Sequence, residues 1–145
     1  MSCKRLRSGS AIMVSKILPD TCAWIDFFRG KPSGMAEKVE AGLLQGEVVT
    51  CGVVLFELLQ GIKSPGEEAL VLSAFQALPH LEMTDGLWIK AGRLSSQLRK
   101  KGQTLPLSDI IIATLALEHN YSVLTVDRHF EDISGLAIVK ISSGS

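Results

Sequence analysis

Short apolar runs alternate along the chain with longer segments in which apolar residues recur every three or four positions. The longer segments have the period of an amphipathic helix, and the short runs lack the alternation of a half-exposed strand. Strands are predicted at 16–20, 47–50, 81–83, 122–126 and 137–141, and helices at 21–29, 33–45, 51–62, 65–78, 85–101 and 106–119. Strands that are apolar on both faces must be covered on both sides. The order therefore predicts a three-layer α/β/α sandwich with a central, mostly parallel sheet.

Local signals mark several boundaries of these elements. Gly30 is suited to end the first helix, Ser33 to cap the second, and Pro65 to begin the fourth. Asn120 suits the left-handed conformation that ends the last helix. Pro19 has no N–H to donate within a sheet, so we expect it at the end of its strand rather than in the middle.

The chain is expected to form one domain. Residues 1–12 precede the periodic pattern and carry three basic residues, which predicts a flexible N-terminal extension before a single domain at 13–145. The extension lacks the apolar core of a secretory signal, and no apolar run is long enough to cross a bilayer, so we expect a cytoplasmic protein without membrane contact. The three cysteines lack metal-site spacing, which predicts reduced thiols, with Cys22 and Cys51 as small buried residues.

The overall charge is balanced, with 15 Lys and Arg against 15 Asp and Glu, and 46% of the residues are hydrophobic. This composition excludes a disordered chain and a generally basic nucleic-acid-binding protein. It does not exclude a site in which several of the acids are gathered locally, since the rest of the chain would then carry an excess of basic residues.

Four acids stand out by their positions. Asp20 and Asp127 directly follow predicted strands, and Glu57 and Asp109 lie in helices that are otherwise apolar. In a parallel sheet, sites form beyond the carboxyl ends of the strands. Carboxylates converging there would repel one another unless a divalent cation bound them, and a set of oxygen ligands suits Mg²⁺ or Mn²⁺.

Each acid also has a structural explanation. Asp20 could cap the following helix, and Asp127 could begin a turn. Asp109 could favour the dipole of its helix, and Glu57 could pair with a distant lysine. The occurrence of all four at strand ends or within apolar helices favours a shared site.

Four segments that carry these acids resemble one known family. They are 17–26 (ILPDTCAWID), 56–61 (FELLQG), 105–113 (LPLSDIIIA) and 124–130 (LTVDRHF). In order and spacing they resemble the PIN-domain ribonucleases, and among these the VapC toxins of prokaryotic toxin–antitoxin pairs. The resemblance extends from about Met13 to the C-terminus, and it departs from the usual pattern at Pro19 and Cys22 without removing an acid.

The resemblance implies an endoribonuclease that uses Mg²⁺ or Mn²⁺ to hydrolyse RNA phosphodiester bonds, leaving a 5′-phosphate and a 3′-hydroxyl. It also implies a homodimeric toxin that inhibits translation by cutting tRNA or rRNA and is neutralised by a cognate VapB-like antitoxin. The site residues that it implies are the catalytic and metal-binding Asp20, Glu57, Asp109 and Asp127, with Thr21, Ser108 and Thr125 as polar neighbours of the metal-bound water.

Contacts with RNA are less directly indicated. Arg128 is next to Asp127 and is a candidate phosphate contact. Arg93 and Arg99 could also follow a phosphate backbone, or they could belong to a solvated helix face with a cationic end. His129 lies near the predicted cleft, but no partner motif for a histidine lies nearby.

Two alternatives of other kinds remain. A haloacid-dehalogenase-like phosphatase would use Asp20 as nucleophile, but it needs a second Asp two residues later, where this chain has Cys22. A non-catalytic PIN-like module would bind RNA or protein without cutting, and the intact set of four acids argues against it.

Overall fold

The computed structural model describes residues 15–141, so the predicted extension at 1–12 lies outside the described residues. The helices are α1 (Thr21–Phe28), α2 (Gly34–Gln45), α3 (Gly52–Gln60), α4 (Pro65–Gln76), α5 (Asp85–Lys100) and α6 (Leu107–His119), with a short 3₁₀ helix, η1 (Arg128–Asp132). The strands are β1 (Ile17–Pro19), β2 (Thr50–Cys51), β3 (His80–Leu81), β4 (Ser122–Leu124) and β5 (Ala137–Ile138). No helix in this part of the chain is long and apolar enough to cross a membrane.

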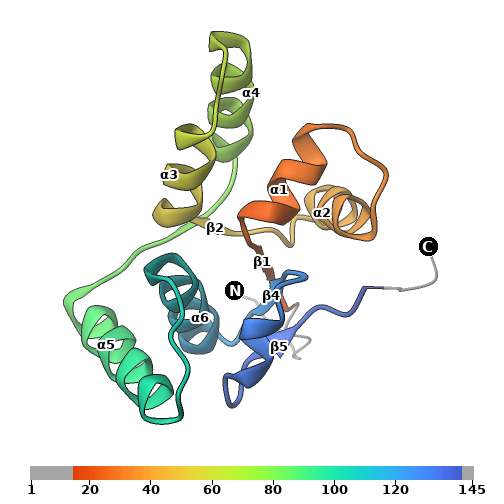
Figure 1. Ribbon diagram of the computed structural model, residues 1–145. Helices are drawn as coiled ribbons and strands as arrows, with labels where there is room; N and C mark the ends of the chain where they lie inside the picture. Colours follow the sequence, from red (N-terminus) through yellow and green to blue (C-terminus); the bar gives the residue numbers. More distant parts are fainter. Residues whose placement is uncertain (1–14, 142–145) are drawn as a thin grey trace, which may run out of the picture.

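The strands form a central parallel sheet, which confirms the predicted fold class. β4 pairs in parallel with β1 on one side and β5 on the other, and β2 pairs in parallel with β3. A parallel bridge from Ile17 to Val48 joins the two sets, giving the order β3-β2-β1-β4-β5. Figure 1 shows α1 and α2 on one side of the strands and α5 and α6 on the other.

The strands in the structure are shorter than the strands predicted from the apolar runs. The predicted strand at 47–50 has only a bridge at Val48 before β2 begins at Thr50, and the strand predicted at 81–83 lies one residue earlier, at His80–Leu81. The strand predicted at 122–126 ends at Leu124, because its partner β1 ends opposite it at Pro19 and is followed by α1. Val126, beyond the strand, is 61% exposed. The 3₁₀ helix η1 was not predicted at all.

The local signals at the ends of the elements are confirmed. Pro19 is the last residue of β1, and Pro65 is the first of α4. The Ser33 hydroxyl accepts a hydrogen bond from the backbone N–H of Ala36 at 3.0 Å and so caps α2. Asn120 has a φ of 60°, which ends α6 as expected.

Aromatic packing fixes α1 against the rest of the core. Trp24 is fully buried, and its ring centroid lies 4.8 Å from that of Phe75 on α4 and 5.5 Å from that of Phe28. Phe130 is also fully buried and anchors η1. These contacts hold the segments that follow β1 and β4 in place, and those segments carry two of the four acids.

The close packing of α2 on the sheet gives a test of the fold. A Cβ at Gly42 would lie 2.8 Å from Val48 Cγ2 and 3.0 Å from Ile17 Cδ1, whereas a Cβ at Gly92 on α5 would meet nothing within 4 Å. Gly42→Ala should therefore lower the free energy of unfolding, since overpacking costs about 1–3 kcal/mol. Gly92→Ala should raise it by about 1 kcal/mol through helix propensity alone. Urea unfolding of both variants checks this, and equal gains in both would contradict the close approach of α2.

Candidate active site

The pairing of β1 with β4 brings two of the predicted acids to one edge of the sheet. Pro19 lies opposite Leu124, and the backbone N–H of Asp20 donates to Leu124 O at 3.0 Å. The Thr125 hydroxyl donates to Asp20 Oδ2 and accepts from the backbone N–H of Asp127 at 3.0 Å. Thr125 therefore ties the ends of both strands, and the acids that follow them, together.

Asp20 is a helix cap and a buried acid at once. Its Oδ1 accepts from the backbone N–H of Ala23 at 3.1 Å, so the capping role considered from the sequence is real. The residue is only 5% exposed, and burial raises the pKa of its carboxyl group. Hydrogen bonds from Thr125 and Ala23 oppose this rise, and the charge of Asp127 adds to it.

Glu57 lies on α3 and is held from α1. The Thr21 hydroxyl donates to Glu57 Oε1 at 2.5 Å. Glu57 could have formed an ion pair with a lysine, but it forms none within residues 15–141. The ion pairs within 4.0 Å in this range are Lys90–Glu118 and His129–Asp127. Glu57 is therefore half-buried with a hydroxyl group, rather than a cation, as its hydrogen-bond partner.

Asp109, in the first turn of α6, completes the set. Burial and the charges of Asp127, Asp20 and Glu57 raise its pKa from 3.8 to about 6, and His129 opposes the rise. The four predicted acids thus act on one another through their charges, although they come from four different segments. We call Asp20, Glu57, Asp109 and Asp127 the acidic cluster.

The remaining predicted residues divide into two groups. Thr21 and Thr125 contact acids directly, as described, and Ser108 is half-buried next to Asp109. Arg128, Arg93 and Arg99 are all exposed, which leaves their predicted role in phosphate binding open to test.

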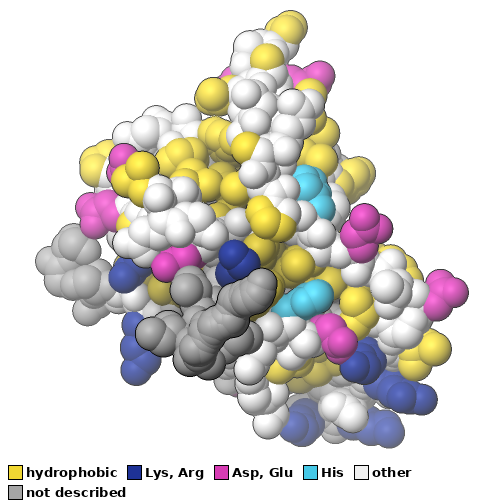
Figure 2. Space-filling model, turned by 180° about the vertical axis from the view of Figure 1, so that it is seen from behind, with side chains coloured by type: hydrophobic (Ala, Val, Ile, Leu, Met, Phe, Trp, Pro, Cys, Tyr) yellow, Lys and Arg dark blue, Asp and Glu magenta, His cyan; other side chains and the backbone are white. Residues whose placement is uncertain are grey.

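The three arginines differ in where they lie. Arg128 begins η1, directly after Asp127. Arg93 lines a hollow between α5 and the end of η1, together with Lys101 and Asp132, in which no member of the acidic cluster takes part. Figure 2 shows Lys and Arg side chains gathered over the end of the molecule where α5 lies.

One residue next to the acidic cluster, Cys22, differs from the sequence-based expectation. Cys22 was expected to be buried, but it is exposed, and its thiol donates to Asp20 Oδ2 at 3.4 Å. Cys51 is buried, as expected. Although the residue as a whole is exposed, partial desolvation of its sulfur and the charge of Asp20 raise the pKa of Cys22 to about 12, so the thiol stays protonated.

His129, expected near the predicted cleft, lies beside Asp127 and Asp109 of the acidic cluster. Its backbone N–H donates to Asp127 Oδ1 at 2.9 Å, and its Nδ1 is 3.0 Å from the same oxygen. One ligand atom from each of Asp109, Asp127 and His129 lies within 4.8 Å of the others. The signal in the sequence was its spacing, two residues after an acid that begins a turn.

Residues 17–136 match the model of the PIN domain, and this range contains the whole acidic cluster. The chain belongs to the PIN-domain family. It is 30% identical over 130 residues to Ribonuclease VapC1 of Methanocaldococcus jannaschii, covering 88% of each chain. It is 26% identical over 131 residues to Ribonuclease VapC11 of Mycobacterium tuberculosis, covering 88% of this chain and 98% of that one.

Solved structures agree with this relationship. A DNA-bound VapBC from Salmonella typhimurium matches with a TM-score of 0.74 and 27% identity, covering 87% of this PIN-domain chain and 98% of the other. The predicted family is confirmed, and the names of the curated relatives agree with the predicted enzyme class, a ribonuclease. The alternative of a haloacid-dehalogenase-like phosphatase is not supported.

The raised pKa of Asp109 predicts a cost to stability that depends on pH. Well below its ordinary pKa of 3.8, this carboxyl group is protonated in both folded and unfolded chains and has no effect on stability. As the pH rises from about 4 to about 6, the unfolded chain ionises first, so the folded state loses stability relative to it. Asp109→Asn should therefore raise the melting temperature in EDTA at pH 7.5, and the gain should shrink as the pH falls below about 6 and vanish below about pH 3.

Asp85→Asn, at an exposed position on α5, is the matched control and should show no such gain. Mg²⁺ or Mn²⁺ should raise the melting temperature of the wild-type protein at pH 7.5 more than that of Asp109→Asn, because a ligand stabilises the folded state that binds it. A pH-independent difference between wild type and Asp109→Asn would show that Asp109 is not under this strain.

Proposed function

We propose that this PIN-domain protein is an endoribonuclease that depends on Mg²⁺ or Mn²⁺, and that it acts as the toxin of a toxin–antitoxin pair in the cytoplasm. One observation carries the proposal: Asp20, Glu57 and Asp127 lie near enough to Asp109 for their charges to raise its pKa, and none of the four is paired with Lys or Arg among the described residues. Such a donor set fits a hard divalent cation. The names of the VapC relatives supply the substrate class, RNA.

In the mechanism that we propose, the four acids of the acidic cluster have different roles. Asp20, Asp109 and Asp127 would hold the metal, directly or through water, and Glu57 would orient a water molecule. A bound divalent ion supplies a more acidic water and stabilises charge on the phosphoryl oxygens. Thr21 holds Oε1 of Glu57, which leaves the second oxygen available to that water. The hydrolysis would release a 5′-phosphate and a 3′-hydroxyl.

The chain also offers groups for orienting RNA. Arg128 directly follows Asp127 and is exposed, so its guanidinium group suits a phosphate next to the one being cut. The exposed Arg93 and Arg99 on α5 would contact more distant phosphates. Cleavage of tRNA or rRNA by such a site would inhibit translation.

The nuclease proposal is tested with purified protein, freed of any bound partner, and total RNA. Wild-type protein should cut RNA when Mg²⁺ or Mn²⁺ is present and not in EDTA, and Asp20→Asn should reduce cleavage to the metal-free background. Asn keeps the oxygen that caps α1, so the fold should be retained. Asp85→Asn should cleave like the wild type.

Equal, metal-independent cleavage by wild type and Asp20→Asn would overturn the proposed activity. An absence of cleavage by the wild type, with cleavage by a known VapC nuclease in the same assay, would favour the alternative of a non-catalytic PIN-like module.

A VapB-like antitoxin is the partner that we propose. An apolar hollow of about 670 Å³ lies between α1, α2 and α4, lined by residues that include Phe28, Leu43 and Leu70. A second hollow shares Phe28 and Leu70 and includes Glu57. A peptide chain that fills both hollows would cover an apolar surface and reach the acidic cluster, which provides a physical basis for inhibition. The Salmonella structure contains VapB and VapC together.

Leu70 provides the test of this groove. Leu70→Arg would place a charge in the apolar hollow and should weaken binding of the cognate antitoxin while leaving RNA cleavage intact. Leu44→Arg on α2 is the control, since Leu44 is 83% exposed and lines neither hollow. Calorimetry measures the affinities, and equal affinity for all three proteins would rule out the groove as the binding surface.

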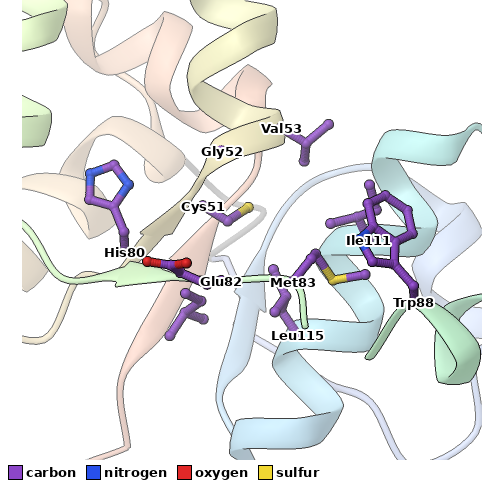
Figure 3. Close-up of a pocket in the computed structure, with 10 residues that line it drawn as sticks. Cys51, Gly52, Val53, His80, Glu82, Met83, Trp88, Ile111 and Leu115 are labelled. Atoms are coloured by element: carbon purple, nitrogen blue, oxygen red, sulfur yellow. The ribbon is translucent and has the colours of Figure 1, made fainter. Parts of the chain in front are cut away.

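We also propose that two copies of the chain associate through a different face. A hollow of about 520 Å³ is lined mainly by apolar side chains, including Val53, Trp88 and Ile111, and none of the four acids lines it. Figure 3 shows that its walls come from the start of α3, β3, α5 and α6. Trp88 is 47% exposed and its neighbour Ile89 55%, so a second copy would cover a large apolar area here.

A further inference from the structure

We infer that His129 is a ligand of the catalytic metal and makes the site favour Mn²⁺ over Mg²⁺. This inference rests on the proposed function and deepens it. It assigns a role to a residue outside the acidic cluster, and it predicts a preference between two ions that the carboxylates alone do not discriminate strongly.

The position of His129 is set by the start of η1. Asp127 caps this 3₁₀ helix by accepting from the His129 backbone N–H at 2.9 Å. The next residue, Phe130, is fully buried and anchors the turn in the core. The His129 side chain is 64% exposed, so it is not there to fill the core. The turn therefore holds the imidazole beside Asp127 and Asp109 of the acidic cluster.

The spacing of the donor atoms fits one coordination shell. In an octahedral complex with bonds of about 2.1 Å, neighbouring ligand atoms lie about 3.0 Å apart and opposite ones about 4.2 Å apart. Nδ1 of His129 lies 3.0 Å from Asp127 Oδ1, the separation of two neighbouring ligands. Asp109 supplies a third atom, with all three within 4.8 Å of one another. Small side-chain shifts would let these three atoms share one ion.

The chemistry of the imidazole then determines the preference. A neutral ring with its proton on Nε2 leaves the Nδ1 lone pair facing the same space as Asp127 Oδ1. Mg²⁺ binds oxygen ligands and retains its water, whereas transition-metal ions accept imidazole nitrogen more readily. A site of carboxylates with one imidazole therefore gains more affinity for Mn²⁺ than for Mg²⁺.

The other two histidines provide the comparison within the chain. Nε2 of His80 lies 3.2 Å from the carbonyl oxygen of Phe75, and the ring of His119 stacks on Tyr121 with centroids 5.6 Å apart. Neither belongs to the group of metal-competent side chains around Asp109. His119→Gln is thus a matched control for His129→Gln, since both remove an exposed imidazole.

The test measures metal binding without RNA. Calorimetric titration with Mn²⁺ and with Mg²⁺ is done on wild type, His129→Gln, His119→Gln and Asp109→Asn, all of which are checked for folding by circular dichroism. His129→Gln should weaken Mn²⁺ binding by about tenfold and change Mg²⁺ binding by less than about threefold. His119→Gln should match the wild type, and Asp109→Asn should weaken binding of both ions.

Pulsed electron paramagnetic resonance of bound Mn²⁺ gives a direct second readout. Coupling to an imidazole ¹⁴N nucleus should be present in the wild type and in His119→Gln. Its absence in the wild type would overturn the inference even if His129→Gln did not fold. Unchanged Mn²⁺ affinity in His129→Gln, or an equal loss for both ions, would also overturn it.

The same titrations distinguish a failure of the role inferred for His129 from a failure of the proposed function. If Asp109→Asn loses both ions and His129→Gln loses neither, the carboxylate site stands and the role of His129 falls. If the wild-type protein binds neither ion, the proposed metal dependence falls with it.

Discussion

The parallel pairing of β1 with β4 is the constraint on which the site depends. It places the residues after the two strands side by side, and the Thr125 hydroxyl then bonds both to Asp20 and to the backbone of Asp127. The core reinforces this arrangement, because Trp24 anchors the helix after β1 and Phe130 anchors the turn after β4. The other two acids come from α3 and α6: the Thr21 hydroxyl donates to Glu57, and a ligand atom of Asp109 lies within 4.8 Å of one of Asp127. The precision of the site is therefore a consequence of ordinary core packing.

Concentrating like charges in this way opposes folding. Asp109 has a raised pKa because it is desolvated and faces three other acids, and the pKa of Asp20 is raised chiefly by burial. Among the ion pairs of the described residues, no lysine or arginine neutralises the negative charge of these acids. Hydroxyl groups and backbone N–H groups supply hydrogen bonds without neutralising it. The divalent cation that we propose would remove this repulsion. The repulsion that lowers stability in its absence would then also increase the stability gained when it binds.

The helix boundaries could be predicted from the sequence, and the four acids could be selected as candidates, because the signals of both are local. Ser33, Pro65 and Asn120 act within one turn of their own positions, and an acid in an apolar segment is conspicuous wherever it lies. The short strands could not be predicted, since an apolar run continues past the last ladder hydrogen bond. The 3₁₀ helix η1 and the exposure of Cys22 could not be predicted either. Both depend on how the segments after β1 and β4 pack against each other, and this packing is set by contacts between residues distant in sequence.

The structural and functional explanations of the acids are not in competition. Asp20 uses Oδ1 to cap α1 and accepts from Thr125 at Oδ2, and Asp127 uses Oδ1 to cap η1. A cap needs only an oxygen acceptor, whereas cation binding needs negative charge. Replacement by Asn keeps the first property and removes the second, while replacement by Ala removes both. Loss of activity in an Ala variant at either position would therefore say little about chemistry, because the two strand ends that bring the acids together would be loosened as well.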